Sequence, residues 1–301
     1  MALPFTKVEG LGNDFVVVDR RPGRPAAPRS GEISPEDPDT VRAICDRRFG
    51  VGADGVLAIL PSATADARMR VLNADGSEAE MCGNGIRCVA KVLYESDPDL
   101  RRPELRIETG AGLLTCAVDV ENHQVRTVAV EMGRPRLTRD EIPLSPVGAG
   151  RALREAITAD GRSFAFTGVS MGNPHAVIFV DADAGDLRAL AERFGPTLER
   201  ADRFPKRANI EFARVRDKQI DVVVWERGCG ITLACGTGAC ATAVAAGLED
   251  RLPLGMETLV HLPGGTLAIA VAPDLSGVRM RGPARTVFAG ELDLGRLAHA
   301  S

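Results

Sequence analysis

Two short segments of this 301-residue chain repeat one order of residues, and that repetition constrains the fold more than any other feature of the sequence. Residues 82–85 and 235–238 each read cysteine, glycine, polar residue, glycine, and the two cysteines stand 153 residues apart. Behind each cysteine, small or apolar residues recur with the spacing of one helical face, at 86, 89, 90 and 93 and at 239, 242, 243 and 246. Each cysteine is therefore predicted to begin a helix, where backbone N–H groups and the helix dipole favour a thiolate and attract an anion.

Two further markers occur in the same order in both halves of the chain. Asn13 and Asn173 each lie in a glycine-containing turn that leads into a β-branched strand finishing with aspartate. A glycine hairpin follows each cysteine, 28 residues later at Gly110 and 29 residues later at Gly264. Three markers in one order at nearly one spacing indicate two homologous halves.

The predicted fold class is therefore α/β, of the α+β type, with two pseudo-symmetric domains. Each domain is expected to wrap a mostly antiparallel sheet around its cysteine-bearing helix. We predict an N-terminal half-site domain over residues 1–132, completed by residues 284–301, and a C-terminal half-site domain over residues 133–283. A chain of this length is compatible with two domains.

Hydrophobic alternation and turn residues predict the elements between these markers. A helix is expected over residues 40–48, and strands over 5–8, 15–19, 56–60, 69–72, 104–108, 113–118, 125–132, 176–181 and 220–225. The stretch 21–38, rich in proline, glycine and arginine, is expected to be an exposed loop. The glycine-rich stretch 50–55 lacks the Lys-Ser/Thr ending of a phosphate-binding loop and is interpreted as a turn.

Composition and charge narrow the class of partner. The formal net charge is −4 with both signs dispersed, and no basic block occurs, so a nucleic-acid partner is not expected. The first residues lack the apolar region of a signal peptide, and no stretch approaches the length of a membrane span. We expect a cytoplasmic protein that does not bind membranes.

The seven cysteines do not form a disulfide framework or a metal site by their spacing. An odd number in an expected cytoplasmic chain favours free thiols over structural disulfides. The gaps between Cys82 and Cys88, Cys229 and Cys235, and Cys235 and Cys240 do not give two matching zinc-type pairs, and no histidine is close in sequence. No metal is predicted.

Three other polar groups are ambiguous when considered alone. Asn13 is compatible with a purely structural turn asparagine. His175 is compatible with a general base or with a buried structural histidine. The dipeptide Glu226-Arg227, at the end of a predicted strand shortly before Cys235, is compatible with a solvated ion pair or with a ligand contact.

Taken together, the motifs resemble those of the diaminopimelate epimerase family. Seven segments carry the resemblance, in this order, at residues 10–15, 73–78, 82–85, 171–175, 207–210, 226–228 and 234–240. The resemblance extends from about residue 5 to about residue 288. It implies a cofactor-independent isomerase that interconverts LL- and meso-diaminopimelate for lysine and peptidoglycan precursor synthesis. It also implies two pseudo-symmetric domains with the small-molecule substrate between them, and a homodimer.

The chemistry of inversion agrees with a pair of thiols. Inverting an α-carbon requires removal of a proton from one face and delivery of a proton to the other, which Cys82 and Cys235 can do by exchanging the roles of thiolate and thiol. The substrate α-carboxylate is expected at the two helix N-termini, at Gly83, Asn84, Gly236 and Thr237. By the resemblance, His175 and Glu226 support the thiols, and further substrate contacts come from Asn13, Asn73, Asn173, Asn209, Glu226 and Arg227.

The chain departs from the family pattern at two positions. Gly55 stands where some members have a glutamine that contacts substrate, and Ile231 stands where relatives often have glutamate. The loop over residues 21–38 has no role that the resemblance supplies.

Two alternative functions share the reactive cysteines. A proline or hydroxyproline racemase uses the same two-thiol logic, but its substrate has no second amino-carboxylate group for Arg227, Asn73 and Asn209 to bind. A thiol-based redox sensor or binding module would need the cysteines alone. Entry of deuterium at a substrate α-carbon separates both enzymes from this third alternative.

Overall fold

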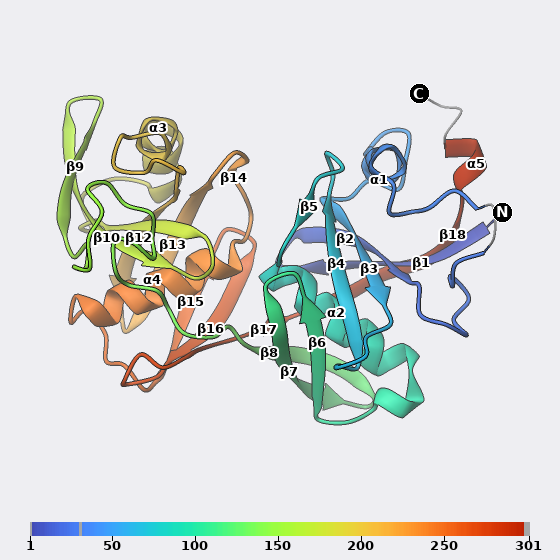
Figure 1. Cartoon of the computed structure of the whole chain (residues 1–301). Coiled ribbons are helices and arrows are strands. Elements are labelled where there is room, and N and C mark those ends of the chain that lie inside the picture. Colours follow the sequence, from blue (N-terminus) through green and yellow to red (C-terminus); the bar gives the residue numbers. More distant parts are fainter. Residues whose placement is uncertain (1, 30–31, 298–301) are drawn as a thin grey trace. The chain divides into compact units, whose positions relative to one another are not determined.

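The computed structural model describes residues 2–29 and 32–297, and the chain divides into two compact units. Unit 1 consists of Met1–Val130 and Gly282–Ser301, and unit 2 consists of Glu131–Arg281. Figure 1 labels the helices and strands of both units. Each unit is described on its own below.

Unit 1 is a mixed sheet in which most neighbouring strands are antiparallel. Only the pairs β2–β3 and β4–β6 are parallel among its described strands. The helices of this unit are α1 (Pro38–Cys45), α2 (Gly83–Ser96), the 3₁₀ helix η1 (Pro98–Leu100) and α5 (Leu294–Leu297). The strands follow one another across the sheet in the order β18 (Arg285–Asp293), β1 (Ala2–Gly10), β2 (Asn13–Asp19), β3 (Gly55–Leu60), β4 (Ala67–Asn73), β6 (Glu104–Thr109), β7 (Gly112–Glu121) and β8 (Gln124–Glu131), and the short β5 (Glu78–Ala79) also pairs with β4.

Unit 2 repeats this plan. Its parallel pairs are β11–β12 and β13–β15, at the places that β2–β3 and β4–β6 occupy in unit 1. Its helices are α3 (Leu187–Glu199) and α4 (Gly236–Leu248). The strand order is β9 (Glu155–Ala159), β10 (Arg162–Ser170), β11 (Pro174–Phe179), β12 (Asn209–Arg216), β13 (Gln219–Glu226), β15 (Glu257–Leu262), β16 (Gly265–Val271) and β17 (Val278–Pro283), and the short β14 (Gly230–Ile231) also pairs with β13.

The matching topology confirms the predicted fold class and the internal duplication. The units differ at one outer edge: the strand beside β1 comes from the C-terminal end of the chain, as β18, whereas the strand beside β10 is β9, which directly precedes it in sequence. Every other step across the sheet has the same direction in both units.

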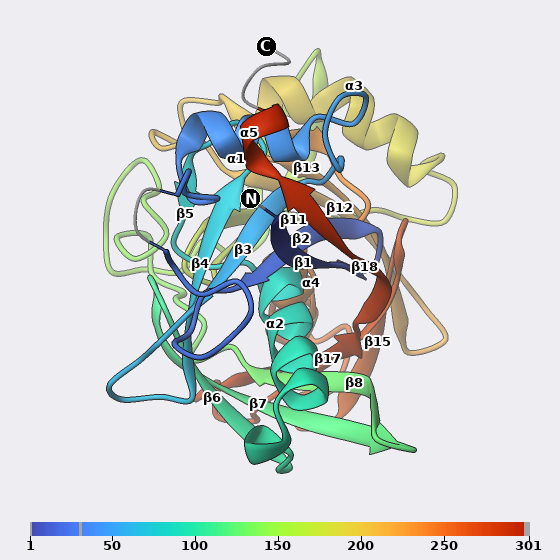
Figure 2. The ribbon, with the colours of Figure 1, turned by 90° about the vertical axis from the view of Figure 1, so that its right-hand side faces the viewer.

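The two cysteine-bearing helices lie at the centre of their units. In unit 1, α2 contacts β1, β2, β3, β4, β6 and β7, and Figure 2 shows it among these strands. The face predicted for this helix, at residues 86, 89, 90 and 93, is fully buried. In unit 2 the predicted face of α4 is also buried, and in both helices the residues between are buried too, because strands contact each helix on several sides.

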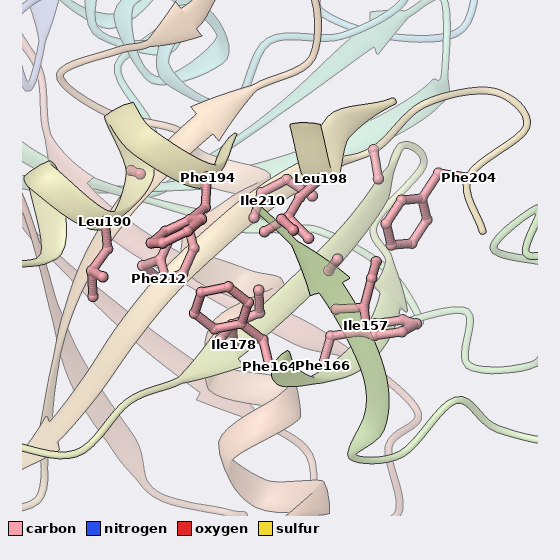
Figure 3. Packing of buried hydrophobic residues seen from close by; sticks show 14 of the residues in the cluster. Ile157, Phe164, Phe166, Ile178, Leu190, Phe194, Leu198, Phe204, Ile210 and Phe212 are labelled. Carbon is pink, nitrogen blue, oxygen red and sulfur yellow. The ribbon is translucent and has the colours of Figure 1, made fainter. Parts of the chain in front are cut away.

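A second hydrophobic core in unit 2 lies between α3 and the sheet, as Figure 3 shows. Phe164 packs edge-to-face against Phe194 and Phe212, with ring centroids 5.0 and 5.6 Å apart. The sequence analysis did not predict α3, although its buried residues have a helical spacing. Asp186 caps this helix by accepting a 2.9 Å hydrogen bond from the backbone N–H of Ala189.

Several predicted boundaries are wrong by a few residues. The helix expected over residues 40–48 begins at Pro38 and ends at Cys45, because the Asp46 carboxylate accepts the backbone N–H groups of Arg48 and Phe49 and starts a turn. The strands expected to reach residues 132 and 181 end at 131 and 179.

The expected loop over residues 21–38 has no strand or helix in its described part before Pro38, which begins α1; its residues 30 and 31 lie outside the described residues. Residues 50–54 form a turn and β3 begins at Gly55. Among the described residues, no helix has both the length and the apolar character needed to cross a membrane.

Candidate active site

Cys82 is the N-terminal cap of α2, as the sequence predicts. Its backbone is extended, with φ −136° and ψ 114°, and its Sγ accepts a 3.3 Å hydrogen bond from the backbone N–H of Gly85. The side chain of Cys82 is half-buried. The sulfur therefore lies at the positive end of the helix dipole, where a negative charge is stabilised.

Asn13 brings a carbonyl oxygen to this sulfur. The Cys82 Sγ lies 3.9 Å from Asn13 Oδ1, and Asn84 donates to the same oxygen from Nδ2 at 3.2 Å. On its other side, Asn13 Nδ2 donates to the Asp54 carboxylate at 2.7 Å. Asn13 is thus not a turn asparagine bonded only to its own backbone; its amide joins the turn to the helix that carries Cys82.

The buried Arg87 fixes the rest of this network. Its guanidinium donates to Asn84 Oδ1 at 3.0 Å, to the Gly83 carbonyl at 2.9 Å and to the Pro283 carbonyl at 3.2 Å. Because Arg87 can only donate, it determines which end of the Asn84 amide faces Asn13.

Cys235 occupies the same place in unit 2, as the N-terminal cap of α4. Its Sγ accepts from the backbone N–H of Gly238 at 3.4 Å and lies 3.5 Å from the Thr237 hydroxyl. Cys235 is buried, with 5% of its surface exposed. The first turn of each helix thus presents one sulfur and backbone N–H groups together.

The environment of Cys235 opposes ionisation of its thiol. Burial raises the pKa of Cys235 well above the usual thiol value, and the nearby Glu226 carboxylate raises it further. Burial also raises the pKa of Glu226, whose carboxyl group hydrogen-bonds to the Cys235 thiol and to the Thr232 hydroxyl. At Cys235, burial therefore outweighs the effect of the helix N-terminus, which by itself favours a thiolate.

His175 is a buried partner in this half-site. Its Nδ1 lies 2.6 Å from Oε1 of Glu211, and its Nε2 lies 2.9 Å from Oδ1 of Asn173. The side chains of His175 and Glu211 have no exposed surface. Burial raises the pKa of Glu211, and the attraction of His175 opposes that rise.

The side chain of Asn209 binds the backbone of Arg227. Asn209 Oδ1 accepts the backbone N–H of Arg227 at 2.8 Å, and Asn209 Nδ2 donates to the Pro174 carbonyl at 3.3 Å. The Arg227 side chain is exposed, and its guanidinium donates to the Lys206 carbonyl at 3.1 Å. No ion pair joins Glu226 to Arg227 in the described part of the chain, so the alternative of a solvated pair is wrong.

Asn73 lies at the end of β4 in unit 1, and its Nδ2 donates to the Ser77 hydroxyl at 3.0 Å. Gly55 pairs with it across β3 and β4. A Cβ at Gly55 would lie 2.5 Å from the Leu72 carbonyl oxygen. A side chain at this position would therefore require one of the two backbones to shift.

The sequence analysis missed several residues of these networks, among them Asp54 and Glu211. Asp54 is 41 residues from Asn13, and Glu211 is 36 residues from His175, so neither pairing has a local pattern. The only signal was a charged residue between two apolar ones, as Glu211 is between Ile210 and Phe212, in a stretch for which the sequence analysis predicted no strand.

The chain matches a model of the diaminopimelate epimerase family over residues 5–138 and 167–287. It is 46% identical over 296 residues to the diaminopimelate epimerase of Desulfitobacterium hafniense, covering 96% of this chain and 98% of that one. It is 48% identical over 290 residues to the diaminopimelate epimerase of Pelotomaculum thermopropionicum, covering 95% and 98%.

The chain belongs to the diaminopimelate epimerase family. The resemblance found in the sequence is thereby confirmed, and the enzyme class of this family is isomerase.

Solved structures of proteins from other families share the fold of this chain. A hydroxyproline epimerase from Agrobacterium vitis matches with a TM-score of 0.68 at 17% identity, over 97% of this chain and 91% of that one. A phenazine biosynthesis protein of the PhzF family from Bacillus anthracis matches with a TM-score of 0.67 at 18% identity, over 97% and 99%. At these identities the likeness concerns the fold alone.

Proposed function

We propose that this chain epimerises LL-diaminopimelate to meso-diaminopimelate, with Cys82 and Cys235 as the two acid–base groups. The observation that carries the proposal is the repeated placement of a cysteine as the cap of the central helix in each unit. Identities of 46% and 48% to diaminopimelate epimerases over nearly the whole chain support the substrate and a role in lysine biosynthesis.

In this mechanism one sulfur removes the α-proton while the other supplies a proton to the opposite face. Because burial raises the pKa of Cys235, we take this group to be the thiol that donates a proton. Cys82, whose sulfur is half-buried at its helix N-terminus, would then be the base. In the reverse direction the two groups exchange roles, since after one turnover Cys82 holds the proton that it removed and Cys235 has given up its own.

Several groups would stabilise the carbanion that forms between the two proton transfers. The N–H groups at the start of α2 and α4, at Gly83, Asn84, Gly236 and Thr237, would bind the α-carboxylate and the charge that develops on it. Glu226 and His175 would hold the Cys235 half-site in its protonation state. No metal or cofactor enters the proposed steps.

The remaining contacts would select the distal end of the substrate. Arg227 has an exposed guanidinium, while its backbone N–H is held by Asn209, and a guanidinium binds a carboxylate through two parallel hydrogen bonds. Asn13, Asn73 and Asn173 would add donors and acceptors for the other polar groups of the substrate. We also expect the homodimer and the cytoplasmic location that the family resemblance implies.

The test is to incubate the enzyme with LL-diaminopimelate in heavy water. The expected result is meso-diaminopimelate with one deuterium at the inverted α-carbon, detected by mass spectrometry and by loss of the α-proton resonance. L-Proline and trans-4-hydroxy-L-proline serve as controls for the alternative racemase. Deuterium in either of these but not in diaminopimelate would overturn the proposal, and no deuterium in any of the three would favour the sensor or binding module.

A further inference from the structure

The two half-sites differ in one buried pair of side chains. In unit 2, His175 of β11 lies against Glu211 of β12. The parallel register places Phe15 and Leu57 at the matching positions of unit 1. His175 pairs with Asn209, two residues before Glu211, and Phe15 pairs with Gly55, two residues before Leu57. An apolar pair thus stands where unit 2 has an acid and a base.

Each pair lies directly beside a cysteine turn. A Cβ at Gly238 would be 3.1 Å from Oε1 of Glu211 and 3.2 Å from Sγ of Cys235. A Cβ at Gly85 would be 3.1 Å from Cδ2 of Leu57 and 3.3 Å from Cβ of Cys82. Glu211 therefore supports the Cys235 turn from the position that Leu57 takes against the Cys82 turn.

The fold does not require the charged pair. Unit 1 builds the same topology with phenylalanine and leucine, and replacing a buried ion pair by well-packed apolar residues is often neutral or stabilising. Oε2 of Glu211 is also buried without a hydrogen-bond partner in the described structure, which is a cost. A pair that costs stability and that the duplicate omits needs a role in function.

The contacts of His175 determine where its ring protons lie. Its Nδ1 faces Glu211 and its Nε2 faces Asn173. A fully buried pair is least costly without net charge, as imidazolium with carboxylate or as imidazole with carboxylic acid. In both forms one proton is shared between Nδ1 and Oε1, so Nε2 carries a proton and donates it to Oδ1 of Asn173.

The Nε2 proton of His175 therefore orients the side-chain amide of Asn173 opposite to that of its duplicate, Asn13. In unit 1 the Asp54 carboxylate can only accept, so it holds the amino group of Asn13, and the carbonyl oxygen faces Cys82 and Asn84. In unit 2 the His175 N–H can only donate, so it holds the carbonyl oxygen of Asn173 and leaves the amino group available.

We propose that Glu211 is a positioning residue which, through His175, holds Asn173 with its amino group available to a substrate carboxylate oxygen. Unit 2 then offers a donor where unit 1 offers an acceptor. An amino-acid α-centre carries both a carboxylate that accepts and an ammonium that donates, so the two matched asparagines suit different substituents. This inference rests on the proposed function for its substrate, although the protonation of His175 can be measured without it.

The environment of the pair includes further titratable groups. Glu226 from β13 and Cys235 from the start of α4 interact electrostatically with it, and Asn209 Nδ2 lies 3.4 Å from His175 Nδ1. The first test therefore reads the ring directly. The chain has four histidines, so ¹⁵N-histidine labelling gives few signals, and the H175F variant assigns the one of interest.

We expect the His175 ring of the full-length enzyme to show a protonated Nε2. In the E211L variant this single state should give way to a mixture of tautomers, because Nδ1 loses its 2.6 Å partner and keeps only the longer 3.4 Å contact with Asn209 Nδ2. E211Q should preserve the wild-type state, since its amide can donate to Nδ1. An unprotonated Nε2 in the wild type would overturn the inference.

Kinetics with diaminopimelate provide the second test. E211L should lower kcat/KM by about 10²-fold, mainly through KM, because a misplaced substrate contact is lost while the thiols remain. E211Q should recover most of this loss. A purely structural role would instead reduce kcat through a smaller folded fraction and leave KM unchanged, which would contradict the inference.

The double variant H175F/E211L copies the unit 1 pair and controls for folding. It should unfold near the wild-type temperature, and E211L should cause no further loss of kcat/KM in the H175F background, because Glu211 acts through His175. Additive losses would overturn the positioning role. If the wild type does not epimerise diaminopimelate at all, the proposed function fails, whereas the tautomer measurement still decides the arrangement of Glu211, His175 and Asn173.

Discussion

Replacing Gly195 by alanine should destabilise unit 2, although alanine is the better helix former. Gly195 lies inside α3, against Trp225 of β13. A Cβ at this position would be 2.5 Å from Cγ, 2.7 Å from Cβ and 2.7 Å from Cδ2 of Trp225. These atoms form the stem of the indole and cannot move aside by a simple side-chain rotation, and Trp225 Nε1 is also held at 2.9 Å by Glu199.

Two opposing effects set the magnitude. Alanine in place of glycine stabilises a helix interior by at most about 1 kcal/mol here, because Pro196 follows directly and disfavours helical angles for a residue with a Cβ. Forcing one extra methyl group into a packed interface costs about 1–3 kcal/mol. Because distances of 2.5–2.7 Å are far below van der Waals contact, we take the upper part of this range and expect a net loss of about 1–2 kcal/mol in the free energy of unfolding.

The assay uses Trp225 itself. It is the only tryptophan of the chain, so its fluorescence during urea unfolding reports on unit 2. Gly247→Ala is the comparison in α4, because there the new Cβ would meet Cδ2 of Leu254 and lie 2.9 Å from its Cγ, and this half-buried leucine side chain can rotate away. This variant should lose less stability than Gly195→Ala. A Gly195→Ala variant at least as stable as the wild type would refute the close-packing argument.

Three further predictions concern the site. Cys82→Ser and Cys235→Ser should each lower epimerisation by at least about 10³-fold, since a serine hydroxyl is too weak an acid for either role; near-normal turnover by one variant in the heavy-water assay would remove that cysteine from the mechanism. Arg227→Ala should raise KM for diaminopimelate by 10-fold or more, on the order of one lost charge-assisted contact, while alkylation of the thiols stays unchanged. Glu226→Gln should lower the pKa of Cys235, so its alkylation, followed by peptide mass spectrometry, should begin at lower pH. Because the folded-state pKa of Glu226 is raised, the folded state binds more protons, and the wild type should lose stability as pH rises from about 4.5 through that pKa; Glu226→Gln should reduce this slope, and an identical slope would contradict the assignment.

The scaffold of each half-site could be predicted from sequence because its signals are local. A cysteine followed by glycine, a polar residue and glycine specifies a helix cap within four positions, and both caps form as expected. The glycine-asparagine turns likewise lead directly into β2 and β11. Repetition then strengthened each local prediction, since the second copy tested the first.

The electrostatics could not be predicted in the same way. The dipole argument for Cys235 used only its own helix, whereas the pKa of its thiol depends on burial by the surrounding strands and on Glu226 from β13. Glu211 and His175 stand on different strands, and only the parallel pairing of β11 with β12 brings them together. Helix α3 was a different kind of miss: its apolar spacing was visible, and the search for duplicated markers passed over it.

The differences between the duplicated halves follow from the chemistry of the proposed reaction. When a proton is exchanged for another on the opposite face, the carboxylate, the ammonium group and the side chain of the α-carbon keep their identities, so they need partners of different kinds. Two identical half-sites would offer the same donors and acceptors twice. The strands that match in topology accordingly end in different groups, with Asn73 at the end of β4 and Glu226 at the end of β13. Five residues after each cysteine stand the buried Arg87 and the buried Cys240. We infer that duplication supplied two equivalent helix caps for the sulfur atoms, and that divergence of the side chains around them made one substrate orientation better than its alternatives.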